Sequence, residues 1–548
     1  MHSPMDLYFL KHVLGVSIGV SIGVSIGLSI GLSFGAASVP AFGAESDQIE
    51  VVLPIQSQEL ADKGAAAGRL KLFLNSTRSK NQGDPADGPF FEDPQPIYSV
   101  FVQSLKPGKP IVIDSNAAGW PVPLDKLSGE YQVQAVFDNH HSERGHHSPG
   151  NLFSKPVTIT FDPIARDTHV IELTESLPEI ELPAIENVVW IDEASPMLSL
   201  ATAKATRQRA AVVLPKEYNN VNFPRRVWPT VYVIPGFGGR FTDIDSTIRL
   251  LRASNSGVVA QAVWVILDPE SPLGHHAFAN SQLNGPRANA LVQEFIPLLQ
   301  ERFRLIRDPA ARLLTGHSSG GWSSLWLLLT HPNDFGGCWS SSPDPVDFSA
   351  FQLCDLYRDE TIFTDAQGKF QGSYRKSIGP VDEKVLMTVA QEVGMERALD
   401  PDGGSGEQWD SWAACFGPPG IRQDLPQRAF DPATGKINHN LIEKYWSKYD
   451  IVRLVTRNWK ELAPVFATKV HLLVGGRDSF YLERAVENLQ KKIAALQEAD
   501  RRAGVATVKG DGFIEIIPDA THDTAAVVAN GRFAISMREY LKKQGFGE

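Results

Sequence analysis

The spacing of hydrophobic residues divides the chain into two parts with different rhythms. From about residue 48 to 175, apolar and polar residues alternate in short runs that are separated by Pro, Gly, Asn and Asp. Such alternation is typical of strands that bury one face, and the turn residues fit short antiparallel connections. We therefore predict an antiparallel β-sandwich over residues 45–180. The clearest predicted strands are 69–74, 97–102, 131–137, 156–161 and 169–173.

After about residue 195 the pattern changes to apolar strands that alternate with helical stretches. This rhythm predicts a mostly parallel sheet covered by helices, which is an α/β domain over residues 195–548. A Pro-rich stretch at 181–194 is interpreted as the linker before it. Residues from about 345 to 460 interrupt the alternation, and we interpret them as an insertion over the edge of the sheet. The predicted strands are 230–234, 262–267, 311–315, 469–474 and 513–517, with a helix over 288–303.

The first 44 residues have the order of a secretory signal. Lys11 and His12 precede an apolar run from 13 to about 34, and small residues follow up to 44. This order predicts export to the periplasm or the medium, with an uncleaved N-terminal membrane anchor as the alternative. The run also contains five matches to the pattern G-x-S-x-G, but its only evident requirement is hydrophobicity. We therefore assign these five matches no chemistry.

Composition narrows the classes of partner and cofactor. The formal charge of −11 disfavours a broad basic surface, so no nucleic-acid partner is expected. Cys338, Cys354 and Cys415 are too few for a disulfide scaffold, although export would allow one disulfide between two of them. None belongs to a C-x-x-C pair, and we expect neither a metal nor a cofactor. No membrane contact is expected beyond the N-terminal anchor.

A sixth match to G-x-S-x-G occurs at Gly316–Gly320, between a predicted strand and a predicted helix over 322–329. A nucleophile elbow requires this context, because the sharp turn lifts the serine above the sheet. Ser318 is therefore the candidate nucleophile. The backbone N–H of Ser319 is a candidate donor to the oxyanion of a tetrahedral intermediate. The alternative is a Gly- and Ser-rich turn that serves tight packing only.

An activated serine needs a histidine base, and His522 is the best placed of the histidines that follow it. It lies in a loop just after the predicted strand 513–517, where the α/β-hydrolase order of serine, acid and histidine places the base. The others lie at the end of the helix after the elbow, in the insertion and within a predicted strand. They are His331, His439 and His471.

Asp478 is the candidate acid because it follows the predicted strand 469–474, at the end where catalytic groups collect in such sheets. It can alternatively cap the helix that begins near Tyr481. Asp519 and Asp523 are rivals, but their closeness to His522 in sequence makes an approach to the ring from behind difficult.

The loop after an early strand supplies the second oxyanion donor in this arrangement. Pro235–Gly239 follows the strand 230–234, and the N–H of Phe237 is the candidate donor. A plain Gly-rich turn is the alternative, and the spacing does not fit a phosphate-binding loop. The candidate substrate-binding residues are Gly236 in this loop, His317 in the elbow and Asn280 in a segment after the strand 262–267. The alternative for the segment with Asn280 is a loop with a structural role only.

These stretches resemble the bacterial putative-esterase family, which is related to esterase D and enterochelin esterase. The resemblance covers about residues 195–540 and implies an α/β-hydrolase domain with Ser318 as nucleophile, Asp478 as acid and His522 as base. It also implies backbone donors at Phe237 and Ser319. The chain departs from the family at Pro235, where histidine is usual. The matching segments are Val212–Tyr218, Trp228–Gly236, Gly316–Gly321, Gly475–Phe480 and Thr521–Asp523.

The first domain looks like the immunoglobulin-like domain that precedes such catalytic domains in some exported esterases. Together the features predict an exported serine hydrolase that cleaves carboxylic esters through an acyl-enzyme. The expected substrate is a small-molecule ester or an ester of a glycan or lipid. The alternatives are an acyltransferase with the same three residues and a non-catalytic binding protein on a hydrolase scaffold.

Overall fold

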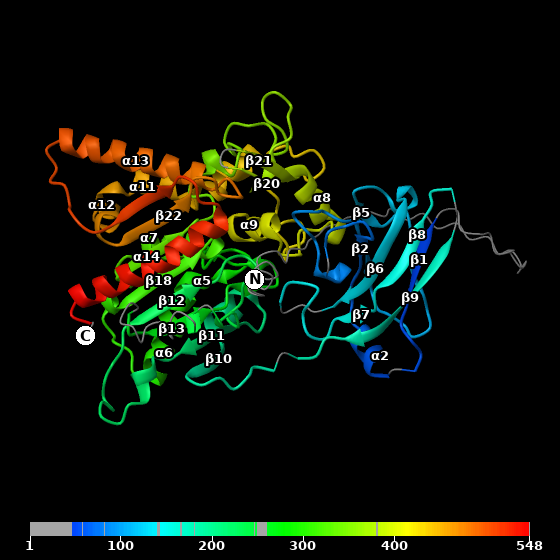
Figure 1. Ribbon diagram of the computed structural model, residues 1–548, viewed down its shortest axis with the longest axis horizontal. Coiled ribbons are helices and arrows are strands. Elements are labelled where there is room, and N and C mark those ends of the chain that lie inside the picture. Colours follow the sequence, from blue (N-terminus) through cyan, green and yellow to red (C-terminus); the bar gives the residue numbers. More distant parts are fainter. Residues whose placement is uncertain are drawn as a thin grey trace, which may run out of the picture. The chain divides into compact units, whose positions relative to one another are not determined.

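The computed structural model describes residues 47–546, apart from 57, 82, 140–142, 165–166, 180, 246, 249–259 and 380–381. The predicted signal over residues 1–44 lies outside the described residues. The chain forms two compact units (Figure 1). Of the described residues, the first unit comprises those from 47 to 179 together with 391–410, and the second comprises those from 181 to 390 together with those from 411 onward.

The first unit is built on a nine-stranded sheet with the order β4-β1-β9-β7-β6-β2-β3-β5, in which β8 also pairs with β6. The predicted antiparallel pairing is correct for most neighbours but wrong for β1 and β9, which are parallel. These two strands stand at opposite ends of the unit's sequence, so the chain between them is long enough for a parallel crossover. The immunoglobulin-like assignment stays a prediction. The elements are β1 (Gln48–Val52), α2 (Gln58–Gly64), β2 (Gly68–Ser76), β3 (Ile97–Val102), β4 (Ile111–Ile113), β5 (Ala118–Trp120), β6 (Gly129–Asp138), β7 (Leu152–Ser154), β8 (Val157–Phe161) and β9 (Thr168–Ser176).

Residues 391–410, which include most of α8 (Val389–Leu399), pack within the first unit. Arg69 forms an ion pair with Asp400, and the Ser99 hydroxyl donates to the carbonyl of Ala398 at 2.6 Å. This differs from the predicted boundaries, which place the segment inside the insertion of the second domain. The contacts join positions about 300 residues apart, so no local pattern indicates them.

The second unit contains an eight-stranded sheet with the order β10-β11-β13-β12-β18-β19-β22-β23. The strands from β13 to β23 in this order are parallel, whereas β10 and β11 are antiparallel, which confirms the predicted mostly parallel sheet. Its strands are β10 (Val188–Ala194), β11 (Arg207–Val213), β12 (Thr230–Ile234), β13 (Val263–Leu267), β18 (Arg312–His317), β19 (Gly337–Ser341), β22 (Val470–Gly475) and β23 (Phe513–Ile517).

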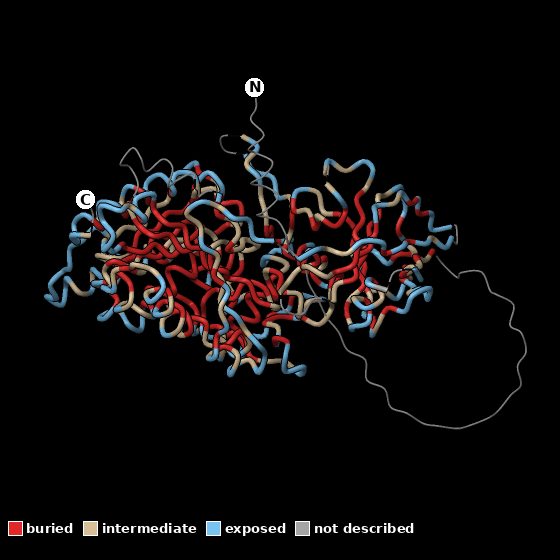
Figure 2. Tube along the Cα trace, turned by 90° about the horizontal axis from the view of Figure 1, so that it is seen from below, coloured by how far each residue is buried: buried red, intermediate tan, exposed pale blue. Residues whose placement is uncertain are grey.

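Helices pack on the sheet and bury its apolar side chains. Phe533 and Met537 of α14 lie in one core cluster with Leu313, Trp339 and Leu473 from three strands. Figure 2 shows buried residues gathered inside the trace and exposed residues along its outside. The helices are α3 (Pro196–Thr202), α5 (Arg287–Ala290), a π-helical turn (Leu291–Phe295), α6 (Ile296–Arg302), α7 (Ser319–Thr330), α9 (Gln408–Phe416), α10 (His439–Lys444), α11 (Ile451–Arg457), α12 (Trp459–Thr468), α13 (Glu483–Arg502) and α14 (His522–Lys543).

Three hairpins lie in the loops of this unit, the longest of them in the predicted insertion. They are β14 (Glu270–Ser271) with β15 (Gly274–His275), β16 (Asn280–Ser281) with β17 (Gly285–Pro286), and β20 (Gly372–Ser377) with β21 (Glu383–Thr388).

Two findings concern the cysteines and the hydropathy of the helices. Cys338, Cys354 and Cys415 are all buried free thiols, so the disulfide that the sequence allows is not formed. Within the described ranges, none of the helices combines the length and the hydropathy that a membrane span requires.

Candidate active site

Ser318 occupies a strained turn between β18 and α7. Its φ of 58° and ψ of −127° lie outside the regions that L-residues usually adopt, so the surrounding structure must hold the turn in place. The N–H of Ser318 donates to the carbonyl of Ser341 at 2.9 Å, and its own carbonyl accepts from Trp322 at 3.0 Å. The strand–turn–helix context expected for an elbow is therefore present.

Two glycines allow the loop after β12 to pass directly beside this turn. A Cβ at Gly320 would collide with the carbonyl oxygen of Ile234, the last residue of β12. A Cβ at Gly236 would lie 3.3 Å from Cβ of Ser318, which is tighter than an ordinary contact. Gly236 precedes Phe237, so the two predicted donor residues, Phe237 and Ser319, both belong to segments that flank the serine.

The structure brings together Asp478, in the loop after β22, and His522, which follows the neighbouring strand β23. The sequence predicts a loop position for His522, but it is the first residue of α14, because Thr521 caps this helix. Nδ1 of His522 lies 2.7 Å from Oδ2 of Asp478, and both side chains are buried. The other carboxylate oxygen of Asp478 accepts from the N–H of Phe480 at 2.9 Å. The alternative of a helix cap does not apply, because α13 begins only at Glu483.

The imidazole of His522 lies at the elbow. Its ring centroid is 4.3 Å from that of His317, the neighbour of Ser318, and 4.9 Å from that of Phe480. Burial disfavours the imidazolium, but the charge of Asp478 and its hydrogen bond outweigh this effect and raise the pKa of His522 above its ordinary value. Burial and the charge of His522 hold the pKa of His317 well below its usual range.

Asp344 is a residue of the site that the sequence analysis missed. It follows β19, and its Oδ2 accepts from the Ser319 hydroxyl at 2.6 Å and from Nε1 of Trp412 at 3.0 Å. Burial raises the pKa of this carboxyl, although both hydrogen bonds oppose the rise. The only feature of the sequence that could have indicated Asp344 is its position beyond the carboxyl end of a strand. Asp347 follows the same strand, so this feature does not single out Asp344.

Arg375 was also missed, and it holds the loop that carries Asp478. From β20 in the insertion, its Nε donates to the carbonyl of Asp478 at 2.8 Å, and its main-chain N–H donates to that of Ser479 at 2.9 Å. Its guanidinium also bonds Glu483 at 2.8 Å. The partners are about 100 residues apart in an irregular segment, so no sequence pattern connects them.

The remaining predicted residues lie around this centre or away from it. Nδ1 of His317 lies 3.1 Å from the Ser341 hydroxyl. Asn280 is exposed on β16, and its side-chain amide bonds Asn289 at 2.9 Å. Its role in substrate binding stays a prediction.

The histidines set aside in the sequence analysis lie elsewhere in the second unit. His331 ends α7, His439 begins α10, and His471 stacks on Trp339 inside the core with ring centroids 4.4 Å apart. In the part of the chain that the structure describes, no three side chains of the types His, Cys, Asp or Glu are grouped as metal ligands.

Comparisons with known proteins point to one family. The model of the family "Putative esterase" matches residues 202–508. An uncharacterized protein, YbbA of Bacillus subtilis (strain 168), is 25% identical over 152 residues, which cover 25% of this chain and 57% of that protein. The match thus spans little more than half of the relative's length.

Solved structures that resemble the chain include two hydrolases. A ferulic acid esterase is 13% identical with a TM-score of 0.36, and the match covers 64% of this chain and 97% of that chain. An S-formylglutathione hydrolase from Agrobacterium tumefaciens is 14% identical with a TM-score of 0.35, with coverage of 65% and 96%.

The family match spans more than half of the 548 residues and contains six of the eight strands of the mostly parallel sheet. It confirms the predicted α/β-hydrolase domain. The chain therefore belongs to the Putative esterase family.

Proposed function

We propose that the protein is a serine hydrolase that cleaves carboxylic esters with Ser318, His522 and Asp478. The observation that carries the proposal is the buried hydrogen bond of 2.7 Å between His522 and Asp478, beside a serine held at a φ of 58°. A base oriented by a carboxylate next to a serine in a sharp turn is the arrangement that activates a serine.

In the proposed reaction, Nε2 of His522 takes the proton of the Ser318 hydroxyl as the oxygen attacks the ester carbonyl. Asp478 keeps the proton on Nδ1 and stabilises the imidazolium. The backbone N–H groups of Ser319 and Phe237 receive the negative charge of the tetrahedral intermediate. His522 then protonates the departing alcohol, which leaves an acyl group on Ser318. Water, deprotonated by His522, releases the acid and regenerates the serine.

The proposed substrate is a small-molecule ester or an ester of a glycan or lipid, encountered after export. Acyl transfer to another alcohol shares the first half of the reaction. Trp412 of the predicted insertion reaches Asp344 beside the elbow, so residues of this insertion help to form the surroundings of the acyl group. If the insertion covers the site and excludes water, an alcohol would be favoured over water as the acceptor of the acyl group. Adding an alcohol to the assay and analysing the products separates transfer from hydrolysis.

The test is labelling by a fluorophosphonate of the protein without residues 1–44, followed by peptide mass mapping. We expect the adduct on Ser318, and we expect Ser318→Ala to lower kcat by a factor of about 10⁴ or more. His522→Ala should abolish labelling. Ser447→Ala removes a half-buried hydroxyl of the 3₁₀ turn Trp446–Lys448 and serves as the matched control. Absence of labelling in folded protein would favour the non-catalytic binding protein instead.

A further inference from the structure

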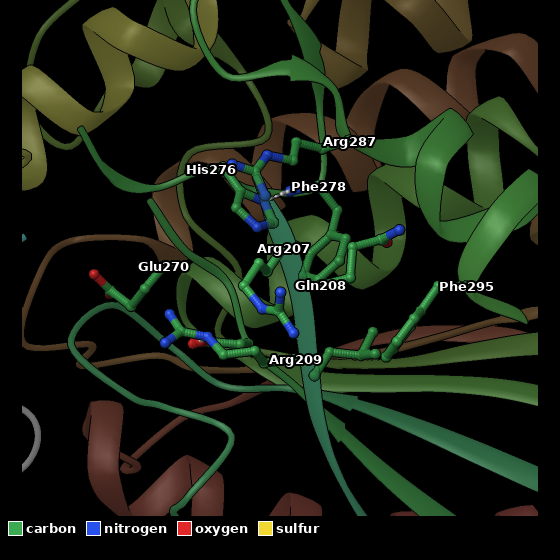
Figure 3. A pocket seen from close by; sticks show the side chains of 10 residues that line it. Arg207, Gln208, Arg209, Glu270, His276, Phe278, Arg287 and Phe295 are labelled. Carbon is green, nitrogen blue, oxygen red and sulfur yellow. Dashed lines mark hydrogen bonds and ion pairs between the residues drawn. The ribbon is translucent and has the colours of Figure 1, made fainter. Parts of the chain in front are cut away.

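A hollow lies in the α/β unit, beside β11 and the end of β13 (Figure 3). Its space, part of which is open to solvent, is about 360 Å³. Its lining includes three arginines, Arg207, Arg209 and Arg287, and two carboxylates, Asp268 and Glu270. Residue 209 faces the carboxyl end of β13, because the N–H of Asp268 donates to the carbonyl of Arg209 at 3.0 Å. The hollow therefore opens at the edge of the sheet where ligands of α/β proteins bind.

Arg287 is a buried cation that feels the charge of Asp268 but forms no direct ion pair with it. Only 7% of the residue is exposed, and burial lowers the pKa of its guanidinium to about 10. Its Nε donates to the carbonyl of Asn284 at 2.9 Å. Among the described residues, no carboxylate forms an ion pair with it. A buried cation without an anionic partner is costly, so an anion in the hollow would be favourable.

Asp268, a carboxylate that lines the hollow, is already paired with other arginines. Oδ2 of Asp268 lies 2.9 Å from Nε of Arg209, and Oδ1 lies 3.2 Å from Nε of Arg240. At the rim, Arg207 bonds Asp192 at 2.6 Å. Asp268 thus fixes the wall of the hollow, while the terminal amino groups of Arg287 remain for a ligand.

The wall of the hollow is connected to the proposed oxyanion loop. Arg240, which bonds Asp268, directly follows Gly239 of the loop after β12. Nε2 of His275 lies 3.0 Å from the carbonyl oxygen of Pro235 in the same loop, and the adjacent His276 lines the hollow. A ligand in the hollow would therefore contact Asp268 and His276, one of which bonds Arg240 while the other adjoins His275, and both of these partners touch or follow the loop beside Ser318.

We propose that the hollow is a binding site for a carboxylate, which Arg287 holds through paired hydrogen bonds. The planar guanidinium matches the two oxygens of a carboxylate, and the lining holds three arginines against two carboxylates. The carboxylate belongs either to the ester substrate, a source that rests on the proposed function, or to a free small acid that occupies the site independently.

Binding is tested directly by saturation-transfer NMR with sodium succinate as the probe. Arg287→Gln removes the charge, and we expect it to weaken binding about tenfold or more. Arg207→Glu reverses a charge at the half-exposed rim and should also weaken binding if the buried variant does not fold. Arg302→Glu is the matched control, since Arg302 is likewise half-exposed and pairs with a carboxylate of β10, Glu193, but does not line the hollow.

Saturable binding that both lining variants weaken and Arg302→Glu leaves unchanged supports the proposal. Absence of binding, or equal binding by folded Arg287→Gln and Arg207→Glu, overturns it. This readout needs no turnover, so it stands even if the protein hydrolyses no ester and the proposed function fails.

Kinetics then distinguish the two sources of the carboxylate. If it belongs to the substrate, 4-nitrophenyl hydrogen succinate should be preferred over 4-nitrophenyl butyrate in kcat/KM by about tenfold, and Arg207→Glu should abolish this preference. If it is free, the two esters should react alike, and succinate should change butyrate hydrolysis saturably in the wild type only. Either pattern supports a carboxylate site, and the absence of both in an active enzyme contradicts it.

Discussion

Two buried carboxylates contact the proposed catalytic site at different points. Asp478 bonds the imidazole itself, whereas Asp344 bonds the hydroxyl of Ser319, whose N–H is the proposed oxyanion donor. Because both acids are buried, their charges are weakly screened, and both contribute to the raised pKa of His522. The protonation of His522 therefore depends on both carboxylates and not only on its hydrogen-bond partner.

The raised pKa of His522 predicts the acid limb of the activity profile. The base acts only when neutral, so kcat/KM should fall about tenfold per pH unit below a pKa that lies above the ordinary histidine value of 6.5. Asp344→Asn removes one of the negative charges that raise this pKa, and should move the acid limb to lower pH. Rate profiles of both proteins between pH 5 and pH 9 measure the shift; a move to higher pH would contradict the assignment.

The bond between Asp344 and Ser319 predicts non-additive kinetics. Ser319→Ala and Asp344→Asn each break the same contact at the first turn of α7. We expect each to lower kcat/KM about tenfold and the double variant to lose little more, since coupled residues do not act additively. Ser324→Ala removes a buried hydroxyl of the same helix that donates to Gly321, and it is the control. Fully additive losses would show that the two residues act separately.

Among the elements, the β20–β21 hairpin explains how the loop after β22 keeps its shape. One arginine of β20 makes two hydrogen bonds to this loop, an ion pair with Glu483, and a contact over the Tyr481 ring at 4.3 Å. Tyr481 has a φ of 62°, so the loop is strained and needs support from outside. A segment that interrupts the sheet in sequence thereby stabilises the acid of the site.

Arg375→Gln should therefore affect both stability and turnover. We expect a loss of about 2–3 kcal/mol in the free energy of unfolding and a fall in kcat of about tenfold or more, with KM little changed. Arg375→Lys should recover only part of the lost stability and turnover, because an ammonium cannot reproduce the guanidinium's planar set of donors. Urea unfolding and steady-state rates measure the two effects. Arg358→Gln changes a largely exposed arginine of the insertion and should alter neither.

The residues of the site differ in how far the sequence alone predicts them. Five of the eight strands of the second unit's sheet were predicted, because hydrophobic periodicity is local, and the positions of Asp478 and His522 after two of these strands follow from strand order. The structure places their side chains within hydrogen-bond distance, and their roles in the site stay predictions. Arg375 and Asp344 were not predictable, because each acts through partners distant in sequence, and arginine or aspartate in an irregular segment is most often solvated.

For the whole molecule, the two units do not correspond to two continuous pieces of sequence. Residues 391–410 leave the second unit's sequence and pack within the first, where Arg144 reaches the fully buried Glu407 at 3.4 Å. Deleting residues up to 180 would remove the partners of Asp400 and Glu407 and expose a segment that belongs to the first unit's core. The first unit is therefore best tested by substitutions within the intact chain.

Two helical glycines provide such a test, since alanine should have opposite effects at them. A Cβ at Gly394 of α8 would lie 2.6 Å from the Trp120 ring, whereas a Cβ at Gly531 of α14 would meet open space. Alanine normally stabilises a helix by about 0.5–1 kcal/mol relative to glycine. We expect this gain for Gly531→Ala, but a loss of about 1–3 kcal/mol for Gly394→Ala, because overpacking must displace the indole.

Urea unfolding measures both changes, and limited proteolysis locates the loss. If residues 391–410 pack against Trp120 in solution, Gly394→Ala should increase cleavage within this segment while Gly531→Ala does not. Equal stabilisation by the two substitutions would contradict the packing, because it would mean that Gly394, like Gly531, faces open space. The segment would then belong with the insertion in which it lies in sequence, and the first unit would end at residue 180.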